Sequence, residues 1–226
     1  MGKKIAVIPI RAEDDFGLEC LGCDVEVYSD DATVADFLAT LDEFSGEYLA
    51  DCRGCDGCCK ERAPWIAADI PALAELAPGD SFPAHRALAA FGQLAIDRRG
   101  VSDICFRRAE DGPCCLLDTA GKFCTAWQSR AFVCRSHFCI PRSDKFARLR
   151  EEIVNAGENE LTRLLLQEEE QGAEPITGKP LAKSLRIEDY PANAQSGRDS
   201  YDQLLLKEIL SPELWAEIKK EPDSTK

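Results

Sequence analysis

The sequence predicts an α+β fold, mainly helical, around a small cysteine-rich core organised by a metal. Two short N-terminal segments have the pattern of a strand pair, and apolar residues recur at helical spacing over much of the remaining chain. Ten of the twelve cysteines lie between Cys52 and Cys139. With 226 residues the chain is long enough to bury a hydrophobic core without disulfides, so the cysteines need another explanation.

The strand pair is expected at Ile5–Ile10, a short apolar run, and at Cys23–Tyr28, where apolar and polar residues alternate. A helix is expected next, with Asp30 or Asp31 as its N-cap. Its apolar face consists of Val34, Phe37, Leu38 and Leu41. The pattern therefore predicts a strand pair and one helix before the first cysteine motif.

Residues 65–76 are typical of a short extended piece followed by a helix capped at Asp69, with Pro71 in the first turn. The Ala-rich segment Ala84–Arg98 predicts a further helix. Between residues 105 and 139 the cysteines, glycines and a proline interrupt any periodicity. We expect loops and short strands there, shaped by the metal.

The cysteines divide the chain into three predicted parts. An N-terminal strand and helix extension (1–50) precedes a cysteine-cluster metal-binding domain (51–143), and a helical C-terminal extension (144–226) follows it. In the last part a terminal helix is expected to begin at Ser211, and residues 171–197 are expected to form a loop.

The net charge of −14 is unevenly distributed. Residues 1–51 carry 3 basic and 13 acidic side chains, residues 52–139 carry 11 and 10, and residues 140–226 carry 13 and 18. No basic stripe is available for a nucleic acid or an anionic membrane, so neither is an expected partner. The N-terminus has no signal-peptide pattern and no segment reaches membrane-spanning length, which predicts a cytoplasmic protein. No protein partner is indicated.

The segment CRGCDGCC places four cysteines within eight residues, at Cys52, Cys55, Cys58 and Cys59. Two-residue gaps between cysteines suit zinc knuckles and iron–sulfur loops. In a reducing cytosol such thiols indicate a metal or catalysis rather than a disulfide framework. Neighbouring side chains of an extended chain point to opposite sides, so Cys58 and Cys59 are not expected to bind the same ion. Either they bind metal at two different sites, or one of them lies beside the ligands without binding the metal itself.

With its downstream cysteines the chain resembles the YkgJ-like cysteine-cluster family, whose members are described as zinc- or iron-chelating domains. The matching positions after the first motif are Asp69-Ile70, Cys114, Leu117, Gly121, Cys124, Trp127, Arg130, Cys134, Arg135 and Cys139. Trp127 replaces the usual tyrosine and Ala131 the usual proline, and neither change removes a candidate ligand. The resemblance covers residues 52–139.

The resemblance implies a ligand set that holds zinc or iron, the iron as an ion or an iron–sulfur cluster. The implied ligands are Cys52, Cys55, Cys58, Cys59, Cys114, Cys124, Cys134 and Cys139. Eight thiolates can form two four-ligand sites, of which one can be a cluster and the other zinc. Thiolates exclude only hard ions such as magnesium and calcium, so the identity of the metal stays open.

Several cysteines and histidines lie outside this set. Cys20 and Cys23 form a second Cys-x2-Cys pair, and with Cys105 and Cys115 they can make a third site or simply pack as small hydrophobes. His137 can replace a thiolate but is interpreted as a supporting or surface residue, and His85 is interpreted as incidental. Arginines near the motifs can lower thiol pKa values or be ordinary surface residues. These are Arg53, Arg107, Arg108, Arg130 and Arg135.

Three functions remain open at this point. The first is a protein that chelates zinc or iron through these cysteines. The second is an iron–sulfur-dependent redox or methyl-transfer enzyme related to the flagellin lysine N-methylases, which carry a comparable motif. The third is a metal store or carrier. The chain has no Gly-rich nucleotide loop, paired-carboxylate motif or histidine triad, so the sequence identifies no catalytic residue and no organic-cofactor site.

Overall fold

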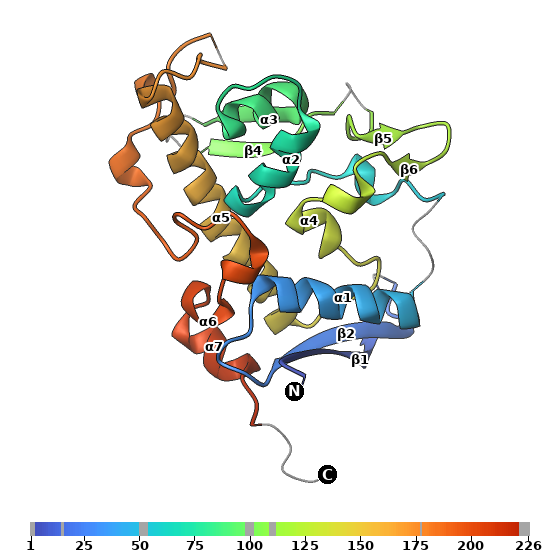
Figure 1. Ribbon diagram of the computed structural model, residues 1–226. Coiled ribbons are helices and arrows are strands. Elements are labelled where there is room, and N and C mark those ends of the chain that lie inside the picture. Colours follow the sequence, from blue (N-terminus) through green and yellow to red (C-terminus); the bar gives the residue numbers. More distant parts are fainter. Residues whose placement is uncertain are drawn as a thin grey trace. The chain divides into compact units, whose positions relative to one another are not determined.

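The computed structural model in Figure 1 describes residues 3–14, 16–49, 54–97, 102–108, 112–176 and 178–221. The chain divides into two compact units. The first comprises residues 1–50, 135–153 and 201–226, and the second comprises 51–134 and 154–200. The predicted α+β class is confirmed, with more helix than strand in the described part of the chain.

The first unit begins with an antiparallel hairpin of β1 (Ile5–Glu13) and β2 (Glu19–Val27). Its register pairs Ile5 with Val27 and Glu13 with Glu19. Alternate residues near the open end of the hairpin are buried, which is the pattern of a strand with one face on the core. The predicted strand pair is confirmed, and both strands are longer than the sequence pattern indicates.

Helix α1 (Val34–Tyr48) follows the hairpin and buries Phe37, Leu38 and Leu41. Thr33 and Asp36 form a capping box at its start, so the expectation that Asp30 or Asp31 caps it is wrong. Both aspartates form ion pairs with lysines instead, Asp30 with Lys207 and Lys219, and Asp31 with Lys4.

The long helix α5 (Asp144–Glu170) contributes its first turns to the first unit. There Phe146 packs against Phe37, with ring centroids 5.6 Å apart. Helices α6 (Leu206–Ile209) and α7 (Pro212–Ile218) complete the unit, and the Ser211 hydroxyl accepts a hydrogen bond from the backbone of α7. This confirms the helices expected after the cysteine region and the start of the last one.

The second unit contains short elements joined by turns. They are α2 (Ile70–Leu76), α3 (Pro83–Phe91), β3 (Gly92–Ile96), β4 (Ser102–Phe106), β5 (Leu117–Asp118), β6 (Phe123–Cys124) and α4 (Phe132–Arg135), whose last residue belongs to the first unit. The expected helix over 84–98 is too long, because the helix ends at Phe91 and the next residues pair with β4. A Cβ on Gly92 would lie 2.1 Å from Leu88, so this glycine allows the abrupt change from helix to strand.

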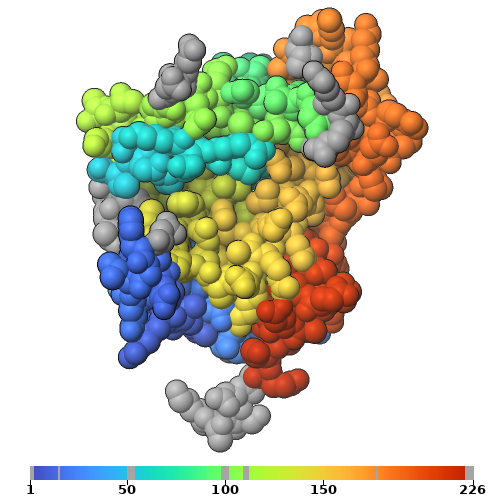
Figure 2. All heavy atoms as spheres, turned by 180° about the vertical axis from the view of Figure 1, so that it is seen from behind, coloured from blue at the N-terminus to red at the C-terminus, as the bar shows by residue number. Residues whose placement is uncertain are grey.

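One hydrophobic core holds the second unit together. Trp65, Leu73, Leu88 and Ile104 pack with leucines from the C-terminal part of α5. The segment before Trp65 runs along β4, as the cyan and green atoms in Figure 2 show, and Trp65 N–H donates to the Ile104 carbonyl over 2.9 Å. The first cysteine motif is therefore anchored to the core through its downstream end.

None of the described helices is long and apolar enough to cross a bilayer.

Candidate metal centre

The first cysteine motif forms a turn rather than an extended strand. Gly54 has a φ of +85°, and its N–H donates to the Lys122 carbonyl over 3.1 Å. A 3-10 turn spans Cys58–Lys60, and the thiols of Cys58 and Cys59 influence each other's pKa. The expectation for Cys58 and Cys59 assumed an extended backbone, which this turn does not have.

The second cysteine segment lies directly against the first. The Cys114 N–H donates to the Cys59 carbonyl over 2.7 Å, and the Leu116 N–H approaches the Cys114 sulfur at 3.5 Å. The thiols of Cys114 and Cys115 likewise influence each other's pKa. Strand pairing of Leu117 with Cys124 then brings the next cysteine back to the same region.

The third segment, helix α4, is held in place by a buried carboxylate. Asp69 is 2 % exposed, and its two oxygens accept from the N–H groups of Ile66 and Phe132, each over 2.8 Å. The expected helix cap at Asp69 is thus realised differently, because the side chain bonds to the preceding turn and to α4 rather than to α2. Phe132 begins the helix that carries Cys134, so Asp69 sets where that cysteine lies.

These segments gather six cysteines, which we call the thiol cluster: Cys58, Cys59, Cys114, Cys115, Cys124 and Cys134. A negative charge on one of these cysteines raises the pKa of cysteines in other segments. Cys124 affects Cys59 in this way, and Cys58 affects Cys134. All six are free thiols. The cluster therefore brings together donors that are far apart in the sequence.

Interactions within the adjacent pairs shift the pKa values of their members in opposite directions. The thiol of Cys59 stabilises the Cys58 thiolate and lowers the pKa of Cys58 to about 6, while the pKa of Cys59 rises. In the second pair the pKa of Cys115 falls to about 7 and that of Cys114 rises. Burial raises the pKa of Cys124 and of Cys134. Within each pair, one thiol therefore loses its proton more readily than its neighbour.

The remaining predicted ligands differ in position. Cys55 is exposed and belongs to the turn that starts at Gly54. Cys52 lies outside the described residues. Cys139 is exposed and belongs to the first unit.

The part of the chain that contains these cysteines matches a known protein family. Residues 51–157 match the CxxCxxCC family, described as "Putative zinc- or iron-chelating domain". Just under half of the chain is therefore similar to the CxxCxxCC domain. Comparison with curated proteins and with solved structures finds no significant match.

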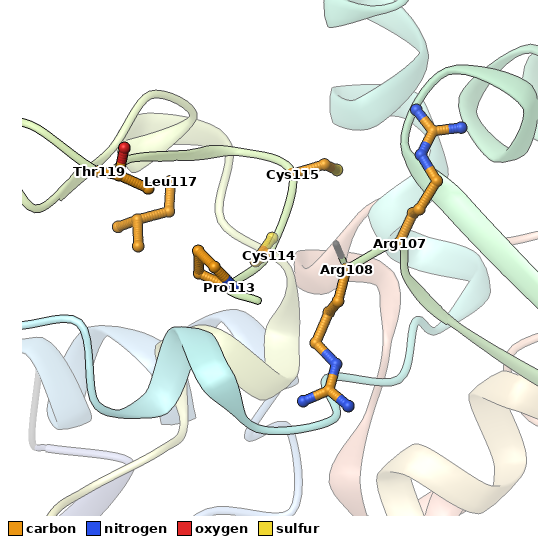
Figure 3. Close-up of a pocket in the computed structure, with 7 residues that line it drawn as sticks. All are labelled: Arg107, Arg108, Pro113, Cys114, Cys115, Leu117 and Thr119. Carbon is orange, nitrogen blue, oxygen red and sulfur yellow. The ribbon is translucent and has the colours of Figure 1, made fainter. Parts of the chain in front are cut away.

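Cys115 is a member of the thiol cluster that the sequence pattern of the CxxCxxCC domain does not single out. Its only local signal is its position next to Cys114. Figure 3 shows both residues beside an open pocket of about 420 Å³, with Arg107 and Arg108 at the end of β4. The structure therefore adds a second adjacent pair to the domain.

The donors of the CxxCxxCC domain fit zinc or iron in kind, because clustered thiols are the ligands these soft or borderline ions prefer. Among the described residues, no three cysteine, histidine or carboxylate groups already stand at metal-binding distances from one point. Binding by these residues would require the thiols to lose protons and move closer together.

The side chains left outside the cluster have other environments. Cys20 and Cys23 lie three positions apart in β2, so they face opposite sides and cannot share an ion. Burial raises the pKa of Cys23 to about 11. His85 is not incidental, because it is buried with its Nδ1 2.7 Å from Glu168. Cys105 lies in β4 beside Arg62 and Asp103.

The arginines near the motifs divide into two groups. The positive charge of Arg130 lowers the pKa of Cys58 and of Cys124, and its guanidinium lies 3.6 Å from the centroid of the Trp127 ring. The charge of Arg107 lowers the pKa of Cys115. Arg135 instead forms an ion pair with Asp42, and Arg53 lies outside the described residues. Two of the five arginines therefore influence the cluster electrostatically.

Proposed function

We propose that this protein binds zinc or iron through the members of the thiol cluster that belong to the predicted ligand set, with Cys52, Cys55 and Cys139 as further ligands. These members are Cys58, Cys59, Cys114, Cys124 and Cys134. The observation that carries the proposal is the backbone bond from Cys114 to Cys59, which joins two adjacent cysteine pairs. Packing alone does not require six thiols from three segments to meet at a partly exposed site. A reducing compartment such as the cytoplasm would keep them available.

The electrostatics of the thiol cluster favour the binding of a cation. Interaction with the adjacent cysteine and burial raise the pKa values of Cys59 and Cys114, and repulsion from the charges of other thiols in the cluster adds to this. A bound divalent ion would stabilise the thiolates and release the thiol protons. When bound, zinc would supply a structural cross-link, whereas an iron–sulfur cluster would add electron transfer.

The test is metal analysis of protein purified without oxygen. We expect stoichiometric zinc or iron, and we expect Cys134→Ser and Cys55→Ser to lose at least about half of it, because each removes a ligand. Cys55 is exposed, so its substitution should leave the fold intact. Cys20→Ser, in the hairpin, is the matched control and should keep the full content. Well-folded protein without metal would contradict the proposal.

A second candidate is a metal store or carrier, which the exposure of Cys55 and Cys115 favours. Rapid loss of metal to a mild chelator would support carriage, and resistance would support a structural or redox centre. A visible spectrum recorded in the same experiment tests the alternative that the protein is an enzyme. Iron with sulfide, a colour that bleaches on reduction and turnover with a substrate would favour an iron–sulfur redox or methyl-transfer enzyme.

A further inference from the structure

The pocket in Figure 3 opens the thiol cluster to solvent. It lies between the residues that follow β4 and the loop that leads into β5, and it has a volume of about 420 Å³. Cys114 and Cys115 both line it, with Pro113 and Leu117 forming an apolar wall. A small molecule in this pocket would therefore touch two thiols of the cluster.

Cys115 is the cluster member best placed to meet such a molecule. It is exposed, whereas the five others are at least partly buried. Its thiol donates to the Phe91 carbonyl over 3.4 Å, and Cys115 directly follows Cys114, which lines the same pocket. Cys114 in turn is bonded through its backbone to Cys59. A continuous series of contacts thus leads from solvent through Cys115 to the interior of the cluster.

Two arginines, Arg107 and Arg108, are among the residues that line the pocket, and their side chains extend in opposite directions (Figure 3). The Arg107 guanidinium donates to the Ala90 carbonyl over 2.6 Å, and that of Arg108 donates to the Lys60 carbonyl. A carbonyl orients a guanidinium but does not neutralise it. Neither arginine forms an ion pair with a carboxylate of the described residues. Two positive charges repel a hydrated divalent cation and attract an anionic complex.

We propose that this pocket is the entrance for the metal, that the metal arrives as a complex with a small anionic thiol compound, and that Cys115 is its first protein ligand. This inference rests on the proposed metal-binding function. In the transfer step a Cys115–metal bond forms as one carrier–metal bond breaks. The Cys115 thiol gives up its proton and the departing carrier thiolate takes one up, while the metal keeps its oxidation state. Cys114 then replaces a second carrier thiolate in the same way.

The experiment measures how fast metal-free protein takes up zinc from its complex with glutathione, an anionic thiol. Removing the entry ligand in Cys115→Ser should slow the initial rate about tenfold, more than it lowers the final metal content. Cys20→Ser is the matched control. The double variant Arg107→Gln/Arg108→Gln should also slow uptake about tenfold, and added salt should slow the wild type, since both weaken attraction of the anion. Uptake from the neutral complex of zinc with two glycinate ions should respond neither to the arginine substitutions nor to added salt, because that complex carries no net charge.

Two results would overturn the inference while leaving metal binding intact. One is an unchanged rate in Cys115→Ser. The other is an equal loss of rate and of final content, which would make Cys115 a permanent ligand rather than an entrance. If wild-type protein takes up no zinc or iron from any source, the proposed function fails instead, so the two failures are distinguishable.

Discussion

Two Cys-x2-Cys pairs in this chain have the same spacing and different geometries. Cys20 and Cys23 lie in the extended strand β2, where residues three positions apart face opposite sides. Cys55 and Cys58 lie in a turn that begins at Gly54 and continues into a 3-10 turn. The comparison teaches that cysteine spacing becomes a ligand set only where the backbone curves and other segments supply the remaining thiols.

The largest expected effect tests the long-range support of the cysteine region. Asp69→Asn removes a carboxylate that holds two backbone N–H groups, so we expect a loss of about 3 kcal/mol in the free energy of unfolding. The matched change Asp36→Asn affects the local capping box of α1 and a partly exposed ion pair with Lys4, and should cost about 1 kcal/mol. Urea unfolding followed by circular dichroism measures both. Equal losses would mean that Asp69 gives no more support than a helix cap.

Two helical glycines give the next contrast. A Cβ at Gly157 would lie 2.3 Å from Ile66, so Gly157→Ala should destabilise the protein by about 2 kcal/mol. At Gly46 in α1 a Cβ meets nothing within 4 Å, so Gly46→Ala should stabilise it by about 0.5 kcal/mol. Thermal unfolding of the two variants measures the difference. The same sign for both would contradict the packing described around Gly157.

Backbone conformation itself is tested at two turn glycines with positive φ. Valine at Gly54 or at Gly17 is strained by about 1–2 kcal/mol, since both sites require the left-handed region and neither has a nearby atom to clash. Only Gly54→Val distorts the turn that carries Cys55 and Cys58. We therefore expect about tenfold weaker zinc binding for Gly54→Val and no change for Gly17→Val, measured by chelator competition. Weaker binding by both would remove the distinction between the two turns.

The smallest effect concerns Glu158 in the second unit. Burial raises its pKa from 4.5 to about 7, Arg62 opposes the shift and Asp103 adds to it. The folded state therefore holds the proton more tightly than the unfolded state, and this contribution to stability is lost as pH rises from about 4.5 to 7. At pH 8, Glu158→Gln should be more stable than wild type by about 1 kcal/mol after allowance for its partial exposure, and equal to it at pH 4. Exposed Glu151→Gln is the control, and a pH-independent gain at Glu158 would rule out the titration.

Local patterns were sufficient for part of the fold. Alternation predicts the hairpin, and 3.6-residue periodicity predicts α1, α2 and α5, because each buries one face of a regular element. The end of α3 was missed because the pairing of β3 with β4 overrides its helix-forming composition. The capping prediction failed at Asp30 and Asp31 because distant lysines engage both carboxylates.

The sequence names most cysteines of the thiol cluster but does not predict how they are arranged. Resemblance identifies Cys58, Cys59, Cys114, Cys124 and Cys134, which the structure brings within electrostatic reach of one another. Cys115 and the roles of Asp69 escaped the sequence because they depend on contacts between distant segments. The three-part domain division and the full ligand set stay predictions.

The bond from Cys114 to Cys59 also bears on how the protein folds. The two residues are separated by α2, α3, β3 and β4, so the bond closes a long loop of the chain. Because closing a long loop costs conformational entropy, we expect this bond to form late in folding. During synthesis the first cysteine motif emerges well before its partners and can bind metal only with an incomplete ligand set. Metal supplied after release of the chain should therefore give a higher yield of correctly folded protein than metal present throughout synthesis, because the first motif is then not captured in a non-native arrangement.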